Sequence, residues 1–128
     1  MIAVDTSSLM AIALDEPLAE ACIAALDAAD EVIISAGTIA EVLIVSTQQT
    51  SVRLALTDLI ERFGFNVVSV TQTSAERIGE VYDRWGKGVN PAGLNFGDCF
   101  AYEVAKSHGC PLLYVGNDFP KTDIESVL

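Results

Sequence analysis

The stretch IAVDTSSLMAIAL, residues 2–14, places an apolar run, a polar turn and a second apolar segment in direct succession. The run at 2–4 is short and uninterrupted, which is typical of a strand buried on both faces. Asp5 closes that strand, and the hydroxyl residues after it suit the start of a helix over residues 7–14. A buried strand that leads directly into a helix is the repeating unit of α/β proteins with parallel sheets.

The same alternation continues along the chain. Apolar runs at 32–34 and 111–115 predict further buried strands, and residues 66–70 predict another strand. Residues 125–128 are expected to add a short edge strand. Helical spacing predicts a helix beginning near Pro17 and others over 38–47, 52–63, 73–85 and 97–107. The pattern therefore predicts a single α/β domain over residues 1–128. Its mainly parallel central sheet should have four or five strands, covered by helices on both faces.

Composition constrains the size of the core and the cellular location of the protein. With 51% apolar residues, a chain of 128 residues can form one sizeable core. No apolar run approaches the roughly 20 residues of a membrane helix, and the start lacks the basic residues of a secretory signal. The three cysteines are odd in number and have no CxxC spacing. A reduced, cytoplasmic location and no contact with membranes are the expectations.

Charge limits the partners. Eighteen acidic residues against seven basic ones give a net charge of −11, and no base precedes Arg53. Such a chain cannot bind nucleic acid through a broad basic face. If it binds nucleic acid, metal ions must supply much of the positive charge. The acidic surface also suits a basic protein partner or a cationic ligand.

Four acidic residues stand where predicted strands end or predicted helices begin: Asp5, Glu41, Asp98 and Asp118. In a parallel α/β sheet these positions share one edge, where ligands bind. Each acid also has a local explanation. Asp5 could cap a helix, Glu41 could form a capping box with Thr38, Asp98 could do so with Asn95, and Asp118 suits a turn.

Those local explanations do not account for all four acids at one edge. Carboxylates gathered in a cleft raise each other's pKa unless a cation neutralises them. Oxygen ligands without a neighbouring Cys or His pair favour a hard ion such as Mg²⁺ or Mn²⁺. The single histidine, His108, stands alone at a predicted helix end and is interpreted as a structural or surface residue.

Five segments carry a family resemblance: MIAVDTSS at 1–8, AEVLI at 40–44, NPAGLNFGDCFAY at 90–102, PLLYVGNDF at 111–119, and Thr122–Asp123. Together they resemble the PIN-domain ribonucleases, in particular the VapC toxins of bacterial toxin–antitoxin pairs. The first motif alone is weak, whereas the segment at 90–102 with the later Gly–Asn–Asp–Phe turn is specific. The matching segments span both ends and the middle of the chain.

The resemblance implies a three-layer α/β/α fold and a metal-dependent endoribonuclease. It places one or two Mg²⁺ ions, with Mn²⁺ substituting, on the four acidic residues Asp5, Glu41, Asp98 and Asp118. A metal-activated water would attack the phosphodiester and leave a 5′-phosphate and a 3′-hydroxyl. Thr6 or Ser7 would hold that water or a neighbouring carboxylate, although Ser7 also suits a helix cap.

Two positions depart from the family pattern. Asn117 stands where the turn often has an acid, and its amide oxygen can still bind a metal but brings no negative charge. Val115 stands where a basic residue is often found, which removes one candidate phosphate contact. Three other basic residues remain as candidate RNA contacts, with ordinary solvated surface as the alternative: Arg84, Lys87 and Lys121.

The resemblance also implies partners. The expected antitoxin is VapB-like, with a basic C-terminal segment whose arginine would enter the acidic cluster and block cleavage. The apolar faces of the predicted helices before residue 64 exceed what one small core needs. They suggest an antitoxin groove and a homodimer surface, with deeper burial within the monomer as the alternative.

Other functions fit the residues less well. A receiver-type phosphoacceptor domain needs paired acids and a late lysine, and Asp5 has no acidic neighbour. A haloacid-dehalogenase-type phosphatase needs Asp–x–Asp, whereas Asp5 is followed by Thr6 and Ser7. The stronger alternative is a catalytically weak or inactive PIN-like module that only binds protein, which the residues at 115 and 117 would fit.

Overall fold

The computed structural model describes all 128 residues and contains four strands and six helices. In chain order the elements are β1 (Ile2–Val4), α1 (Thr6–Ala13), α2 (Ala19–Ala28), β2 (Val32–Ser35), α3 (Ala36–Val45), α4 (Thr50–Arg62), β3 (Asn66–Val68), α5 (Gln72–Trp85), α6 (Phe96–His108) and β4 (Leu112–Leu113). Every helix predicted from the sequence is present, with ends that differ by at most two residues from the predicted ones. None of the six helices combines the length and apolarity needed to cross a membrane.

The four strands form one sheet in the order β3-β2-β1-β4, and all neighbouring strands are parallel. In the centre of the sheet, Ala3 of β1 is paired with Ile33 of β2 on one side and with Leu112 of β4 on the other. The predicted parallel sheet of four or five strands is therefore confirmed with four.

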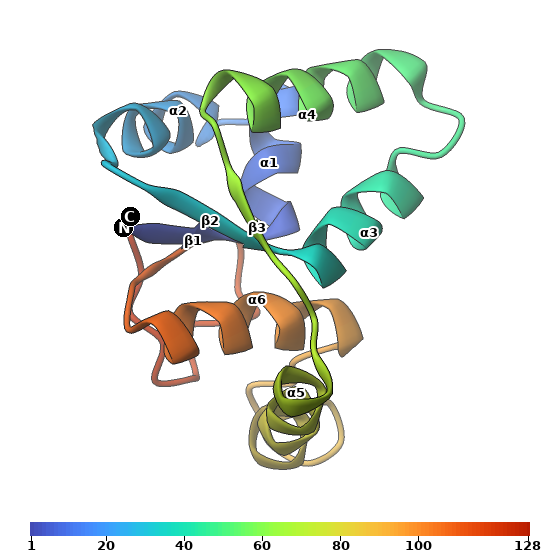
Figure 1. Cartoon of the computed structure of the whole chain (residues 1–128), viewed down its shortest axis with the longest axis vertical. Coiled ribbons are helices and arrows are strands. Elements are labelled where there is room, and N and C mark those ends of the chain that lie inside the picture. Colours follow the sequence, from blue (N-terminus) through green and yellow to red (C-terminus); the bar gives the residue numbers. More distant parts are fainter.

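Helices cover both faces of the sheet, which gives three layers (Figure 1). Helices α1, α2 and α4 lie on one face, whereas α6 lies on the other with α5 packed outside it. Helix α3 follows β2 directly and lies beside the end of the sheet, where it contacts α6. This arrangement is the three-layer α/β/α architecture that the family resemblance implied.

The alternation of strand side chains builds a separate core on each face. In β1, Ala3 points into the cluster with α5 and α6, while Ile2 and Val4 point into the cluster with α1, α2 and α4. In β4, Leu112 points into the cluster with α5 and α6, and Leu113 points into the cluster with α1, α2 and α4. Because β1, β2 and β4 are buried on both faces, their sequences are almost wholly apolar and show no polar alternation. The edge strand β3 is largely exposed instead.

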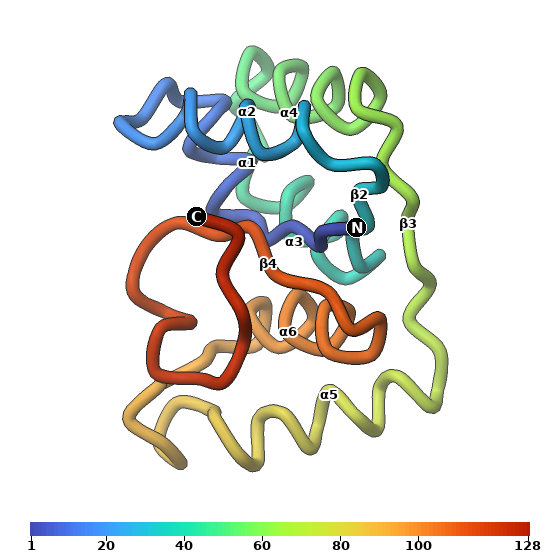
Figure 2. Tube along the Cα trace, turned by 90° about the vertical axis from the view of Figure 1, so that its left-hand side faces the viewer, coloured from blue at the N-terminus to red at the C-terminus, as the bar shows by residue number.

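The C-terminal segment differs from the prediction. Strand β4 is limited to two residues, and the last residues make only an isolated bridge between Leu112 and Ser126 instead of an edge strand. Figure 2 shows the chain leaving β4 as a long loop, drawn in red, that returns toward the strand. The three cysteines are free, with Cys22 and Cys99 buried and Cys110 half-buried.

Candidate active site

Asp5 lies at the carboxyl end of β1 and caps α1, as the turn sequence predicted. Its Oδ2 accepts hydrogen bonds from the Ser7 amide at 3.0 Å and from the Ser7 hydroxyl at 2.6 Å. The same Ser7 oxygen accepts a hydrogen bond from the Val115 amide at 3.0 Å, which links the ends of β1 and β4. The other oxygen of Asp5, Oδ1, is buried and has no hydrogen-bond partner.

Glu41 is held by a residue that is distant in the sequence. The Thr6 hydroxyl donates a short hydrogen bond to its Oε1. The predicted capping box between Thr38 and Glu41 is wrong, because α3 begins at Ala36 and Ser35 caps it through a bond from the Gly37 amide at 3.1 Å. This earlier start places Glu41 beyond the first turn of α3.

Gly97 makes room for the Glu41 carboxylate. A Cβ atom at position 97 would lie 1.8 Å from Oε2 of Glu41, so a side chain there would displace the carboxylate. The sequence pattern did not identify this glycine as part of the site. The one local signal was a glycine in the first turn of a helix, where it disfavours helix formation relative to alanine by roughly 1 kcal/mol.

Asp98 lies in the first turn of α6 and forms the predicted capping box with Asn95. The Asn95 side chain accepts a hydrogen bond from the Asp98 amide at 2.9 Å, and Oδ2 of Asp98 accepts one from the Asn95 amide at 2.9 Å. The Asp98 residue is only 5% exposed. A structural cap and a buried carboxyl group are thus combined in one side chain.

The four predicted acids are coupled electrostatically. Burial raises the pKa of Asp98 to about 7, and the charges of Asp5, Asp118 and Glu41 raise it as well. Burial also raises the pKa of Asp5 to about 6, opposed by the Ser7 hydrogen bonds and assisted by the charge of Glu41. Perturbed carboxyl groups of this kind are concentrated at functional sites.

Asp118 differs from the other three acids. It lies in an exposed turn after β4, next to the equally exposed Asn117, and its side chain makes no hydrogen bond within the protein. Its charge nonetheless contributes to the raised pKa of Asp98. Asp118 is therefore near enough to Asp98 for their charges to interact, but no direct contact fixes its side chain.

The side chains as they lie do not form a ready-made metal site. No group of three or more His, Cys, Asp or Glu side chains is arranged so that it could hold a metal ion. Instead, Asp5, Glu41 and Asp98 each accept hydrogen bonds from donors of their own. The oxygen atoms of these acids still fit a hard cation, because the buried Oδ1 of Asp5 has no hydrogen-bond partner and the neighbouring acids supply only oxygen ligands.

The predicted basic residues lie in different settings. The Arg84 guanidinium lies 4.6 Å from the centre of the Trp85 ring and 3.8 Å from Oδ2 of Asp123, so it is already engaged within the protein. Lys87 lines an apolar groove of about 640 Å³ between α5 and the start of α6. Lys121 is exposed and forms no ion pair.

Apolar side chains remain exposed on the helices of the N-terminal half, as predicted. On α3, Ile44 is 71% exposed, and on α4, Leu54 is 64% exposed. A groove between these helices is lined mainly by Ile39, Val42, Leu43, Ile60 and Val67. The alternative of deeper burial within the monomer holds for Val42, which is 1% exposed, but not for Ile44 and Leu54.

Comparison with known proteins extends these observations. The PIN domain family model matches residues 2–125. "Ribonuclease VapC36" of Mycobacterium tuberculosis is 42% identical over 125 residues, which cover 95% of this chain and 90% of that protein. "Ribonuclease VapC" of Mycolicibacterium smegmatis is 36% identical, with coverage of 97% and 98%.

Solved structures agree with this assignment at the level of the fold. The crystal structure of Mycobacterium tuberculosis VapC20, described as a sarcin-ricin loop cleaving toxin, superposes with a TM-score of 0.79 at 17% identity, covering 99% of this chain and 98% of that one. A toxin-antitoxin complex from Klebsiella pneumoniae matches with a TM-score of 0.69 at 21% identity, covering 96% and 93%. The chain therefore belongs to the PIN-domain family and is a relative of the VapC ribonucleases.

Proposed function

We propose that this protein is a Mg²⁺-dependent endoribonuclease and the toxin of a toxin–antitoxin pair. Asp5, Glu41, Asp98 and Asp118 would hold the ion, with Mn²⁺ able to replace it. The observation that carries the proposal is the coupling of these carboxyl groups at one edge of the sheet, around a buried oxygen of Asp5 that has no partner. Membership of the PIN-domain family and the ribonuclease activity by which its relatives are named support the proposal.

The bound ion would polarise the phosphodiester, lower the pKa of a water molecule that attacks phosphorus, and neutralise the leaving 3′ oxygen. The chain's own part is to hold the ligands. Ser7 fixes one oxygen of Asp5 and leaves the other free, while Thr6 holds Glu41 against α6. We expect products that carry a 5′-phosphate and a 3′-hydroxyl.

Asn117 and Val115 reduce the charge that the site offers to RNA and metal. Asn117 supplies an amide oxygen without negative charge, and Val115 supplies no cation for a phosphate. Lys87 and Lys121 are exposed cations that remain free to contact RNA. Arg84 would first have to leave Asp123.

The proposed partner of the toxin is a VapB-like antitoxin with a basic C-terminal segment. An arginine from that segment would pair with the coupled carboxylates and exclude the cation. The exposed apolar side chains on α3 and α4 offer a surface for the antitoxin or for a second copy of the toxin in a homodimer.

Cleavage of RNA by the purified protein tests the proposal. We expect Mg²⁺-dependent cutting, abolished by EDTA, and a fall of about 100-fold or more in kcat/KM for Asp98→Asn, because even partners behind metal ligands contribute roughly 10–100-fold. The asparagine can keep the capping bond to Asn95, so the variant should remain folded by circular dichroism. Sequencing of the cut 5′ ends would define the RNA target.

A second candidate function is a PIN-like module that binds protein without cutting RNA. It is favoured by the absence of three acidic side chains already arranged around a common centre. This candidate wins if neither wild type nor Asp98→Asn cuts any RNA with Mg²⁺ or Mn²⁺ present, while both bind the antitoxin equally.

A further inference from the structure

The turn that carries Asp118 has few bonds of its own. Residues 116–121 take part in one backbone hydrogen bond, which the Thr122 amide donates to the Phe119 carbonyl at 2.9 Å. The Asp118 side chain is exposed and makes no hydrogen bond. Its position therefore depends on what anchors the chain after it.

The first anchor is the residue that follows Asp118. Phe119 is 1% exposed, and its ring centre lies 5.0 Å from that of Tyr114. The Thr122 hydroxyl donates a hydrogen bond to the Phe119 carbonyl at 2.7 Å and accepts one from the Ile124 amide at 3.2 Å. These contacts close the turn, but all of them join residues within the segment 114–124 to one another.

The second anchor ties the segment to the helices. The hydroxyl of Tyr102 on α6 donates a short hydrogen bond to Oδ1 of Asp123. The ammonium of Lys106 and the guanidinium of Arg84 lie 3.3 Å and 3.8 Å from Oδ2 of the same carboxylate. Asp123 is thus the one residue of the segment whose side chain is bonded to both α5 and α6.

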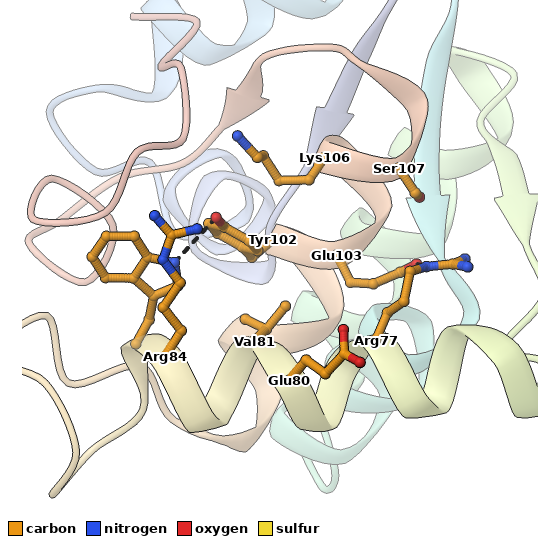
Figure 3. A pocket seen from close by; sticks show the side chains of 9 residues that line it. Arg77, Glu80, Val81, Arg84, Tyr102, Glu103, Lys106 and Ser107 are labelled. Carbon is orange, nitrogen blue, oxygen red and sulfur yellow. Dashed lines mark hydrogen bonds and ion pairs between the residues drawn. The ribbon is translucent and has the colours of Figure 1, made fainter.

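The Tyr102 hydroxyl is itself held in place. The indole Nε1 of Trp85 donates a hydrogen bond of 3.1 Å to the Tyr102 hydroxyl oxygen. Figure 3 shows Tyr102 on α6 among the side chains that line the groove between α5 and α6. Tyr102 is only 4% exposed. A buried hydroxyl that already accepts one hydrogen bond needs an acceptor for its own proton, and Asp123 supplies it.

The charge on Asp123 is favoured by the same partners. The hydrogen bond from Tyr102 lowers the pKa of Asp123, and Lys106 and Arg84 lower it further. Hydrogen bonds to an ionised acceptor are roughly twice as strong as those between neutral groups. The anchor should therefore weaken when the carboxylate is replaced by an amide of the same shape.

We propose that Asp123 is a positioning residue that orders the turn at 116–121 and so places Asp118 at the acidic edge of the sheet. This inference rests on the proposed function for its catalytic consequence. The ordering of the turn is a separate property that can be measured whether or not the protein cuts RNA.

Hydrogen exchange tests the ordering directly. Asp123→Asn and Tyr102→Phe should each increase amide exchange in peptides that cover 114–124, and the double variant should show no more than the stronger single one. Arg77→Gln is the matched control, because it removes the 2.9 Å ion pair to Glu103 between the same two helices without touching the turn. Unchanged exchange in Asp123→Asn, or an equal increase in Arg77→Gln, would overturn the proposal.

Metal binding tests the consequence. By isothermal titration with Mn²⁺, Asp123→Asn should weaken binding by about tenfold, as for other residues that orient metal ligands. In an Asp118→Asn background the same substitution should have no further effect, because the ligand that it positions is gone. Equal weakening in both backgrounds would show that Asp123 acts elsewhere. If wild type binds no Mn²⁺, the proposed function fails, and hydrogen exchange still decides whether Asp123 orders the turn.

Discussion

At the scale of single residues, Gly97 illustrates how a position without a side chain can define a site. The Glu41 carboxylate occupies the space that a Cβ at position 97 would fill. Because Oε2 is the far end of a flexible side chain, an added methyl would move the carboxylate and leave the backbone in place. Stability and activity should therefore respond differently to substitution.

We expect Gly97→Ala to lower kcat/KM for RNA by at least about tenfold. Displacing the Glu41 carboxylate should reduce activity at least as much as removing a residue that orients a metal ligand. The melting temperature should stay the same or rise, because alanine favours the helix by up to about 1 kcal/mol. Gly79→Ala on α5 is the control, since a Cβ there meets nothing within 4 Å. Full activity of Gly97→Ala would contradict the assigned place of Glu41.

The raised pKa values of Asp98 and Asp5 make stability depend on pH. Burial and neighbouring charges raise these pKa values from 3.8 to about 7 and about 6 in the folded protein. Between about pH 4 and about pH 7 the folded protein then binds more protons than the unfolded chain, so the free energy of unfolding decreases as the pH rises. For Asp98 the decrease is on the order of 4 kcal/mol.

Thermal unfolding in EDTA at several pH values measures this effect. Wild type should lose stability from about pH 5 to about pH 7.5, and Asp98→Asn should lose much less. Asp27→Asn, an exposed acid on α2, corrects for the overall negative charge. A pH dependence that is the same in Asp98→Asn and wild type would show that the Asp98 carboxyl is not perturbed.

At the scale of elements, α3 contains a buried polar atom that its own helix does not satisfy. Thr38 is 1% exposed, and its hydroxyl has no hydrogen-bond partner. A buried hydroxyl without a partner costs about 1–3 kcal/mol. The predicted capping box would have given this hydroxyl a partner, but the cap at Ser35 places Thr38 inside the helix.

Thr38→Val should therefore raise the free energy of unfolding by about 1 kcal/mol, because valine fills the same space without a polar group. Denaturant unfolding with an unchanged m-value would measure the gain. Thr57→Val on α4 is the comparison, since that exposed hydroxyl already donates to the Arg53 carbonyl at 3.0 Å. Loss of stability in Thr38→Val would mean that the hydroxyl has a partner in solution.

At the scale of the whole molecule, the net charge of −11 sets the response to cations. A divalent ion that binds the folded protein at the acidic edge stabilises it by about 2.7 kcal/mol when its free concentration is about 100 times its Kd. Monovalent salt acts on the same charge only by screening.

Mn²⁺ should raise the melting temperature of wild type by several degrees but hardly change that of Asp5→Ala, which lacks the buried carboxylate. Sodium chloride at matched ionic strength should give a smaller rise, equal in the two proteins. Differential scanning fluorimetry can measure all four conditions. Equal Mn²⁺ shifts in wild type and Asp5→Ala would argue against a shared site.

Local sequence correctly predicted those features whose conformation depends on contacts between neighbouring residues. The buried strands, the helix ends at Gly64 and Gly109, and the cap of α6 by Asn95 follow from residues within one turn of each other. The same reasoning failed at Glu41, because two capping residues compete in this segment and Ser35, at the end of β2, is the one that α3 uses. Local propensity does not decide between nearby caps.

The residue pattern is sufficient to predict the alternation of strands and helices, and with it the acids where strands end and helices begin. Which hydrogen-bond donor each carboxylate finds depends on how distant segments pack together. Thr6 reaches Glu41 across 35 positions, and Ser7 reaches Val115 across 108. These bonds depend on β1 lying between β2 and β4, an order fixed by the burial of both sheet faces at once and not by any single segment.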